Sequence, residues 1–350
     1  MSNHIEDLLS EWQLTPYEGW VLAVVTKVQG SAYRKAGAMM LFHPLGKSIG
    51  LVSGGCLEGD LKRHAQRAIQ YDTAIKLVYD GTDESDTTYQ LGCGGIIELM
   101  LFPLTSKNHY LQLHRLAENL QAGIACLYEL VLPEEGTSSD LFDASVVNPS
   151  ESHYPPSDVQ KPAIFTLEQA DLQTDPQEMQ QEHRLIIPCR PRFHLAIFGG
   201  GLGAQPLANI ANQLGWQVTV IDERTSYARH HDFPSSTIIK QTPSKLTNEI
   251  MNRFDAAVVM QHNLTLDANA ILRLSQTKLS YTALLGPPHR RDKVLAMAGV
   301  SASDFSGIFS APAGLALGGE LPESIALSIL AQCHGVLHKA RQISLDKVMT

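Results

Sequence analysis

The sequence predicts an α/β protein in which a mixed α/β N-terminal domain over residues 1–132 precedes a doubly wound parallel-sheet domain over residues 193–350. From residue 193 onward, apolar strand-like runs alternate with helical stretches, the pattern of a parallel sheet covered by helices on both faces. A glycine-rich turn follows the first of these runs. Between the two domains, residues 133–192 are rich in Pro, Ser, Asp, Glu and Gln. That composition predicts a polar linker or insertion with at most one hairpin.

The elements of the first domain follow from hydrophobic periodicity. Apolar residues recur at helical spacing through 57–71, at Leu57, Leu61, Ala65 and Ala68, and this pattern predicts a helix. Further helices are expected over 4–12 and 108–121. Strands are expected over 21–28, 38–43, 48–54, 75–80, 96–102 and 125–132.

Composition excludes several classes of protein. The 350 residues are 44% hydrophobic and 18% charged, and they carry a net charge of −9. The apolar content is enough for two globular cores, and the negative charge argues against a nucleic-acid partner. The N-terminus does not resemble a signal peptide, and no apolar stretch is long enough to span a bilayer. We therefore expect a cytoplasmic protein that binds neither nucleic acid nor a membrane.

The five cysteines are widely spaced and form no CxxC motif. An odd number at such spacing argues against a disulfide scaffold and against a structural zinc site. We therefore expect reduced thiols, with Cys126 and Cys333 packed as small core residues.

The turn after the first C-terminal strand has the spacing of a dinucleotide-binding fingerprint. Gly199, Gly201 and Ala204 fit G-x-G-x-x-G/A between the apolar segment 194–198 and a helix. Glycines permit a tight turn and the approach of a phosphate, and Ala204 permits close helix packing. Asp222 ends the next strand, roughly 20 residues on, where a carboxylate would meet a ribose hydroxyl. This order predicts a Rossmann-like domain, and both nucleotide binding and a purely structural turn stay open.

Two loops of the first domain place a cysteine among glycines. Glycine leaves a neighbouring thiol and the backbone open to a ligand. The loops contain Ser53, Gly54, Gly55, Cys56 and Glu58 in one case, and Cys93, Gly94 and Gly95 in the other. Cys56 precedes a predicted helix, whose free N–H groups and dipole stabilise a thiolate, a soft metal ligand. The alternative is two glycine-rich turns with incidental cysteines.

A third segment, residues 30–40, carries Arg34 and Lys35 between two predicted strands. Arg34 has the donor geometry that binds a phosphate. A solvated basic turn is the alternative.

Taken in order, these segments resemble the XdhC/CoxI family of xanthine dehydrogenase accessory proteins. The family patterns G-S-A-x-R-x-x-G, S-G-G-C-x-E-G and C-G-G with a nearby Glu are matched at 30–37, 53–59 and 93–98. In the second half, the matches are the I-F-G-x-G turn at 197–201, His262 with Asp267, Gly286 with Arg290 and Arg291, and the segment 311–331. The sequence departs from the family at Leu202, where histidine is frequent.

The resemblance implies a chaperone without a turnover product of its own. Such a protein binds the molybdenum cofactor, supports its maturation, and inserts it into xanthine dehydrogenase-type hydroxylases. Implied partners are that molybdoenzyme, a cysteine desulfurase and a second copy in a homodimer. Cys56 and Cys93 would lie near the molybdenum, and Arg34 and the glycine loops would bind the terminal phosphate of the pterin.

Two other functions stay open. The second domain could bind NAD(P) or another nucleotide in an oxidoreductase or regulatory protein. His262 would then carry a proton beside Asp267 or Arg290, or it would simply hydrogen-bond a turn at a strand end. The chain could also be an interaction module that docks a desulfurase or a hydroxylase.

Overall fold

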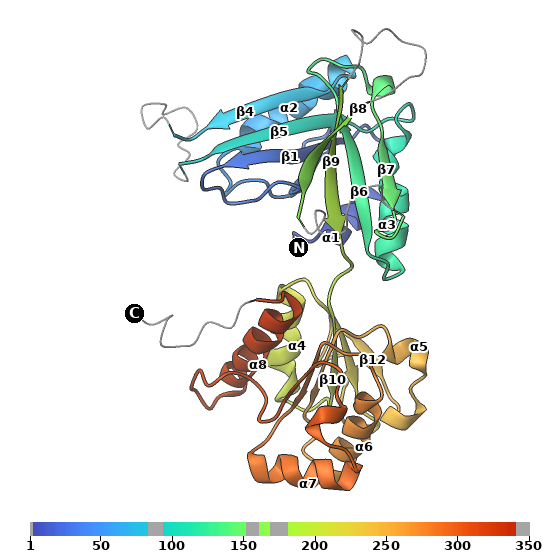
Figure 1. The fold of residues 1–350 in the computed structure, drawn as a ribbon, viewed down its shortest axis with the longest axis vertical. Helices are drawn as coiled ribbons and strands as arrows, with labels where there is room; N and C mark the ends of the chain where they lie inside the picture. Colours follow the sequence, from blue (N-terminus) through green and yellow to red (C-terminus); the bar gives the residue numbers. More distant parts are fainter. Residues whose placement is uncertain (1–2, 83–93, 152–160, 169–180, 341–350) are drawn as a thin grey trace. The chain divides into compact units, whose positions relative to one another are not determined.

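The computed structural model describes residues 3–82, 94–151, 161–168 and 181–340 (Figure 1). The chain forms two compact units, Met1–Pro191 and Arg192–Thr350. Each unit has its own sheets and core. None of the helices in the described ranges combines the length and apolar character that a bilayer-spanning segment needs.

The first unit opens with a five-stranded antiparallel sheet in the order β3-β2-β1-β5-β4. The strands are β1 (Val21–Gln29), β2 (Met39–Phe42), β3 (Ser48–Gly50), β4 (Ile75–Asp80) and β5 (Ile96–Pro103). Side chains of β1 alternate between two cores, because successive residues of a strand point to opposite faces. Val21, Ala23 and Val25 pack with helix α2 (Glu58–Tyr71). Leu22 and Val24 pack with helices α1 (Ile5–Trp12) and α3 (Leu113–Gln121).

Residues 133–192, expected to be a polar linker, instead supply three strands of a second antiparallel sheet. Its order is β7-β6-β9-β8. The strands are β6 (Cys126–Leu132), β7 (Ala144–Val147), β8 (Ala163–Glu168) and β9 (Gln181–Cys189). The expectation was wrong because the polar stretches between these strands dominate the composition of the segment and conceal three short apolar runs. A few buried side chains, including Val146, Leu185 and Ile187, nevertheless complete the core beneath the first sheet.

The helix expected over 108–121 is shorter than predicted. Only Leu113–Gln121 is α-helical, whereas His109–Gln112 form a turn in which all four φ angles are positive, between 50° and 56°. No glycine marks this left-handed turn in the sequence, so the spacing of apolar residues alone extended the predicted helix too far.

The second unit has the predicted Rossmann-like architecture. Its six strands are all parallel, in the order β12-β11-β10-β13-β14-β15. They are β10 (His194–Phe198), β11 (Gln217–Ile221), β12 (Thr237–Ile239), β13 (Ala256–Val259), β14 (Tyr281–Leu284) and β15 (Ile308–Ser310). The strand order reverses between β10 and β13. Ligands of open α/β sheets bind at the carboxyl edge beside such a switch point.

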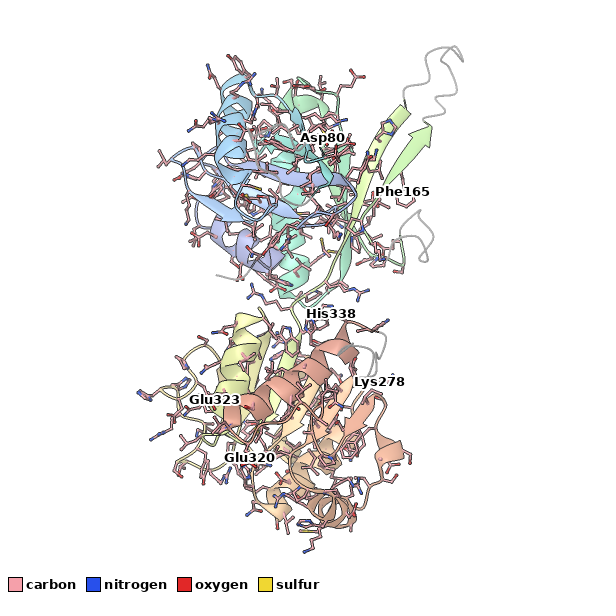
Figure 2. The ribbon with its side chains drawn as sticks, turned by 90° about the vertical axis from the view of Figure 1, so that its left-hand side faces the viewer. Asp80, Phe165, Lys278, Glu320, Glu323 and His338 are labelled. Carbon is pink, nitrogen blue, oxygen red and sulfur yellow. The ribbon has the colours of Figure 1, made fainter. Side chains whose placement is uncertain are left out.

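Helices cover both faces of this sheet. Helices α4 (Ala204–Gln213) and α8 (Pro322–Leu337) share one core with the sheet. Helices α5 (Asn248–Met251), α6 (Leu264–Ser275) and α7 (Pro288–Ala298) cover the other face. Glu323 lies in the first turn of α8, and His338 caps the end of this helix (Figure 2).

Candidate functional site

The glycine turn of the second unit passes close to two neighbouring segments. Gly199 has φ 117°, and a Cβ on it would lie 2.7 Å from the carbonyl carbon of Met260. A Cβ on Gly200 would lie 2.4 Å from the amide nitrogen of Ala228. No larger residue fits at either position without a backbone shift. Both glycines therefore have a structural role, and neither by itself requires a ligand.

The helix that follows this turn begins without a side-chain cap. Ala204 is buried at the first position of α4, and Gly203 at the N-cap provides no side-chain hydrogen bond. Leu202 is 77% exposed beside it. The uncapped N–H groups of a helix of this length attract an anion.

Asp222, predicted to meet a ribose, is instead enclosed by the protein. Its side chain is fully buried. Oδ1 accepts from Nε of Arg224 at 2.9 Å, and Oδ2 accepts from Nη2 of Arg224 at 2.7 Å and from the amide of Gly200 at 2.9 Å. Burial alone would raise the pKa of this carboxyl, but the hydrogen bonds from Arg224 and Gly200 outweigh burial and hold the pKa below its ordinary value.

Arg224 extends over the end of the central strand. Its Nη1 donates to the carbonyl of Gln261 at 3.2 Å, after β13, while its other nitrogens bind Asp222, after β11. Strand β10 lies between β11 and β13. The guanidinium also lies 3.7 Å from the ring centroid of Tyr227. Arg224 therefore places a cation above the glycine turn, and no sequence motif predicted it.

The other predicted residues of this unit meet at the end of β13. Asp267 is buried, accepts from the amide of Gln261 at 3.1 Å, and pairs with Arg290. Burial raises the pKa of Asp267 although the bond from Arg290 opposes the rise. Gly286 is needed here because a Cβ would lie 2.5 Å from Cδ of Arg290. Asp267 and Arg290 thus form an ion pair between a buried carboxylate and a half-buried guanidinium.

His262 and Gln261 lie at the same edge. His262 is exposed with φ 55°, and it makes no hydrogen bond within the described parts of the chain. Gln261 is 3% exposed, and its Nε2 is buried without a partner among the described residues. An unpaired buried donor is costly, and the sequence alone contains no signal for it.

The thiol loop of the first unit is held by Ser53 and Glu58. Both carboxylate oxygens of Glu58 are used, one by the amide of Ser53 at 3.1 Å and one by its hydroxyl at 2.6 Å. The Ser53 hydroxyl in turn accepts from the amides of Gly55 and Leu57. Cys56 is exposed between them, two residues before α2. This network fixes the backbone while it leaves the thiol uncovered.

The three predicted segments of this unit lie against one another. A Cβ on Gly95 would lie 2.1 Å from the carbonyl oxygen of Ser31, so the 94–95 segment packs directly on the loop after β1. Tyr33 of that same loop approaches Gly54, 3.9 Å from where a Cβ would stand. Cys93 itself lies outside the described residues. The structure therefore brings together the loops of Arg34, Cys56 and Gly95.

Several glycines here are not explained by packing. Within the described ranges a Cβ on Gly55, Gly59 or Gly94 would meet no atom within 4 Å, and only at Gly55 and Gly94 does a positive φ favour glycine. Gly59 also lacks a positive φ and lies in the first turn of α2, where alanine is favoured by about 1 kcal/mol. Open space beside these glycines is what a ligand approaching the backbone requires.

Charge and metal-binding groups around the thiol loop are sparse. Arg34 is half-buried and pairs with no acid in the described ranges. Within those ranges no group of three or more His, Cys, Asp or Glu could hold a metal ion. Cys126, Cys189 and Cys333 are buried, and burial raises the pKa of each thiol. Cys56 is thus the exposed thiol of the four described cysteines.

Fold and site together define a two-unit protein, in which a glycine- and cysteine-loop unit of antiparallel sheets precedes a Rossmann-like unit. Residues 195–333 match the family described as the XdhC Rossmann domain, and residues 15–80 match the XdhC and CoxI family. A Bacillus subtilis protein, described as a probable subunit of xanthine dehydrogenase, is 32% identical over 333 residues, which cover 91% of this chain and 93% of the relative. The chain belongs to the XdhC/CoxI family and is a homologue of xanthine dehydrogenase accessory proteins.

A solved structure is similar to this chain over nearly its whole length. It is a Bacillus halodurans protein described as a xanthine dehydrogenase, with a TM-score of 0.76 and 27% identity, and the match covers 97% of this chain and 98% of that one. The family relation predicted from the motifs is thus confirmed.

Proposed function

We propose that this protein binds the molybdenum cofactor and supports its maturation and insertion into a xanthine dehydrogenase-type hydroxylase. The observation that carries the proposal is the exposed thiol of Cys56. It lies in a glycine loop that hydrogen bonds between Ser53 and Glu58 hold in place, next to the loop of Arg34. Family membership supports the link to a molybdenum enzyme. The recipient hydroxylase, a cysteine desulfurase and a second copy of this chain are the partners that this function would involve.

The residues of the first unit fit the cofactor in chemical type. A thiolate is a soft ligand suited to molybdenum, and Cys56 would supply it, with Cys93 as a second candidate. Arg34 would bind the terminal phosphate of the pterin, since a guanidinium without an acid partner is free to bind an anion. Gly55, Gly59 and Gly94 would let the ligand approach the backbone. When bound, the cofactor supplies the redox-active metal that the recipient enzyme needs.

The test is a binding titration of the full chain with isolated molybdenum cofactor under exclusion of oxygen. Cys56→Ser should weaken binding roughly tenfold or more, a factor that corresponds to about 1.4 kcal/mol. Cys333→Ser, which changes a buried thiol of the second unit, is the matched control and should bind like the unaltered protein. Equal affinity of both variants would remove Cys56 from the site.

A second candidate function rests on the second unit. We infer that the switch point binds a phosphate-bearing nucleotide, because the uncapped start of α4, the cation of Arg224 and the unpaired Nε2 of Gln261 lie at one edge of a Rossmann-like sheet. Adding NADH, NADPH or ADP-ribose to the full chain tests this inference. Absence of binding by all three would exclude it.

A further inference from the structure

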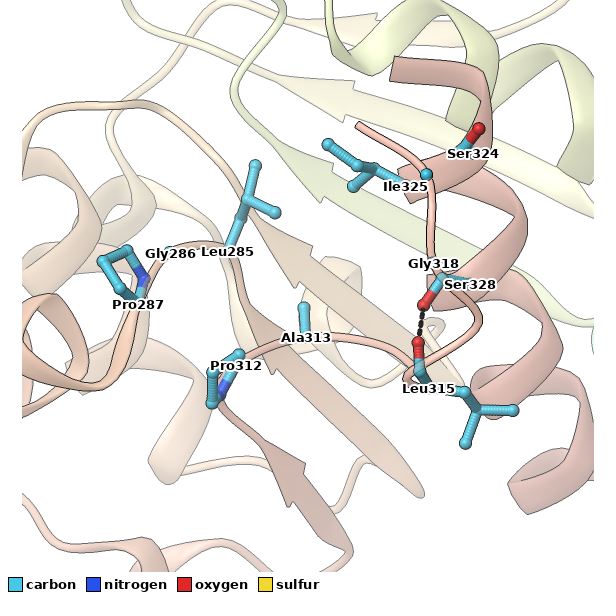
Figure 3. Close-up of a pocket in the computed structure, with 11 residues that line it drawn as sticks. Leu285, Gly286, Pro287, Pro312, Ala313, Leu315, Gly318, Ser324, Ile325 and Ser328 are labelled. Carbon is cyan, nitrogen blue, oxygen red and sulfur yellow. Dashed lines mark hydrogen bonds between the residues drawn. The ribbon is translucent and has the colours of Figure 1, made fainter. Parts of the chain in front are cut away.

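A pocket of about 300 Å³ opens at the carboxyl edge of the second unit, beyond the glycine turn (Figure 3). Three segments form it: the end of β14, the loop after β15, and the first turns of α8. Leu285, Ala313 and Ile325 lie on three of its sides, one from each segment. All three also pack against the core beneath α4 and α8, which fixes their positions. The volume is at the lower end of the range for small-molecule sites, about 300–1,000 Å³.

The pocket continues the edge already described. Gly286 lines the pocket and touches Arg290, which pairs with Asp267. Asp267 accepts a hydrogen bond from the backbone amide of Gln261. The backbone carbonyl of Gln261 accepts a hydrogen bond from Arg224 above the glycine turn. Adjacent strands lie about 4.8 Å apart, so the ends of β10 and β14, two positions apart in the sheet, are roughly 10 Å from each other. One ligand of nucleotide size spans that distance.

The two ends of this edge differ in charge. Arg224 stands at the end near the glycine turn, whereas none of the eleven residues that line the pocket is charged. Acidic residues Glu320 and Glu323 are sequence neighbours of the lining residues Gly319 and Ser324. The uncharged lining offers an anionic group no ion-pair partner, whereas Arg224 and the uncapped start of α4 lie over β10. An uncharged or cationic ring fits the pocket.

The lining chemistry favours a flat ring over a sugar. Its walls are mainly Leu, Ile, Ala and Pro side chains. Of the two hydroxyls in the lining, that of Ser328 is already bonded to the carbonyl of Leu315, which leaves that of Ser324 (Figure 3). A sugar needs several side-chain hydrogen-bonding partners, whereas an aromatic face needs apolar contact. Gly318 and Gly319 provide backbone groups at the rim for the ring substituents.

We propose that this pocket binds the flat heterocyclic ring of a phosphate-bearing ligand, with the phosphates directed toward Arg224 and the start of α4. The proposal rests on the second candidate function, since it names the part of that ligand which enters the pocket. Two sources share this chemistry, a nicotinamide nucleotide and a pterin phosphate; the second source would place the molybdenum cofactor in this unit in place of the site at Arg34 and Cys56. In either case the second unit recognises the ring, not only the phosphate.

The experiment compares two substitutions to phenylalanine in one loop. Ala313→Phe fills the pocket, while Ala316→Phe changes an exposed residue that does not line it. NADH and ADP-ribose share the diphosphate and differ in the nicotinamide ring, and isolated molybdenum cofactor is the third probe. Equilibrium dialysis of the full chain measures each affinity, and thermal unfolding confirms that both variants are folded. Ile325→Ala, which removes a wall without adding bulk, serves if Ala313→Phe does not fold.

We expect Ala313→Phe to weaken NADH binding roughly tenfold relative to Ala316→Phe, with ADP-ribose affinity equal in the two. If NADH does not bind but Ala313→Phe selectively weakens binding of the molybdenum cofactor, the ring is a pterin. If ADP-ribose and NADH each bind every variant with the same affinity, and cofactor binding is also unchanged, the ring pocket is overturned and the phosphate site stands. Absence of binding by all three probes overturns both.

Discussion

Arg224 binds both carboxylate oxygens of Asp222, at 2.9 Å through Nε and at 2.7 Å through Nη2. In a Rossmann-like sheet, the acid at the end of the second strand is expected to face a ribose. Here the same acid binds the guanidinium of Arg224 above the glycine turn, and it also accepts a hydrogen bond from the amide of Gly200. The carboxylate of Asp222 is therefore occupied by protein donors, and it positions the guanidinium of Arg224 at this edge of the sheet.

Replacing Arg224 with Met should destabilise the second unit and weaken its affinity for ADP-ribose. The substitution leaves the buried carboxylate of Asp222 with fewer donors, which costs roughly 1–3 kcal/mol. Guanidinium unfolding measures the stability. Arg229→Met removes an exposed ion pair with Asp232, and such pairs add little to stability. Equal losses in the two variants would show that the Asp222 pair has no special role.

The stability of the second unit should fall as the pH drops from about 7.5 to 5, because of His194. Burial, with a smaller contribution from Arg253, lowers the pKa of His194 to about 4, below its ordinary value of 6.5, while its Nε2 bonds Thr219 at 2.8 Å. Between these two values the unfolded chain binds a proton that the folded chain does not, so acid favours unfolding. The loss from this group is about 2 kcal/mol by pH 5.

Denaturant unfolding of His194→Gln at both pH values checks this origin. The variant should lose most of that pH dependence, whereas replacement of the exposed His230 by Gln should leave it as it is. A pH dependence that His194→Gln does not reduce would assign the effect to another group.

Two alanine substitutions near the thiol loop should have opposite effects on stability. Gly95→Ala drives a methyl group against the carbonyl oxygen of Ser31, where the Cβ would lie at 2.1 Å, and should destabilise the first unit by about 1–3 kcal/mol. Gly59→Ala meets no atom within 4 Å in the first turn of α2 and should stabilise this unit by up to about 1 kcal/mol.

Measuring the affinity for the molybdenum cofactor separates the role of Gly59 in the fold from its role in ligand binding. If the open space beside this glycine admits the molybdenum cofactor, Gly59→Ala should bind the cofactor more weakly although it is more stable. A variant that is stabilised and binds normally would mean that Gly59 does not face the ligand.

The motifs predicted the glycine turn and the glycine loops, but not the connections around them. The turn at Gly199 and the loop at Cys56 could be predicted from the sequence, because glycine at fixed spacing has a local cause: a tight turn, or the close approach of another group to the backbone. Arg224 could not be predicted, because its position depends on the carbonyl of Gln261, in the loop after another strand, β13. The strands within 133–192 were missed for a similar reason: Leu185 and Ile187 are buried by tertiary pairing with β6, which local composition does not report.

The central claim is that this chain binds the molybdenum cofactor through the loop of Cys56. The most direct test incubates the full chain with isolated cofactor without oxygen, and then measures pterin and molybdenum in the protein fraction after gel filtration. We predict pterin and molybdenum in equimolar amounts with the protein, and their loss in Cys56→Ser but not in Cys333→Ser. A folded protein that elutes without pterin and molybdenum would contradict this claim.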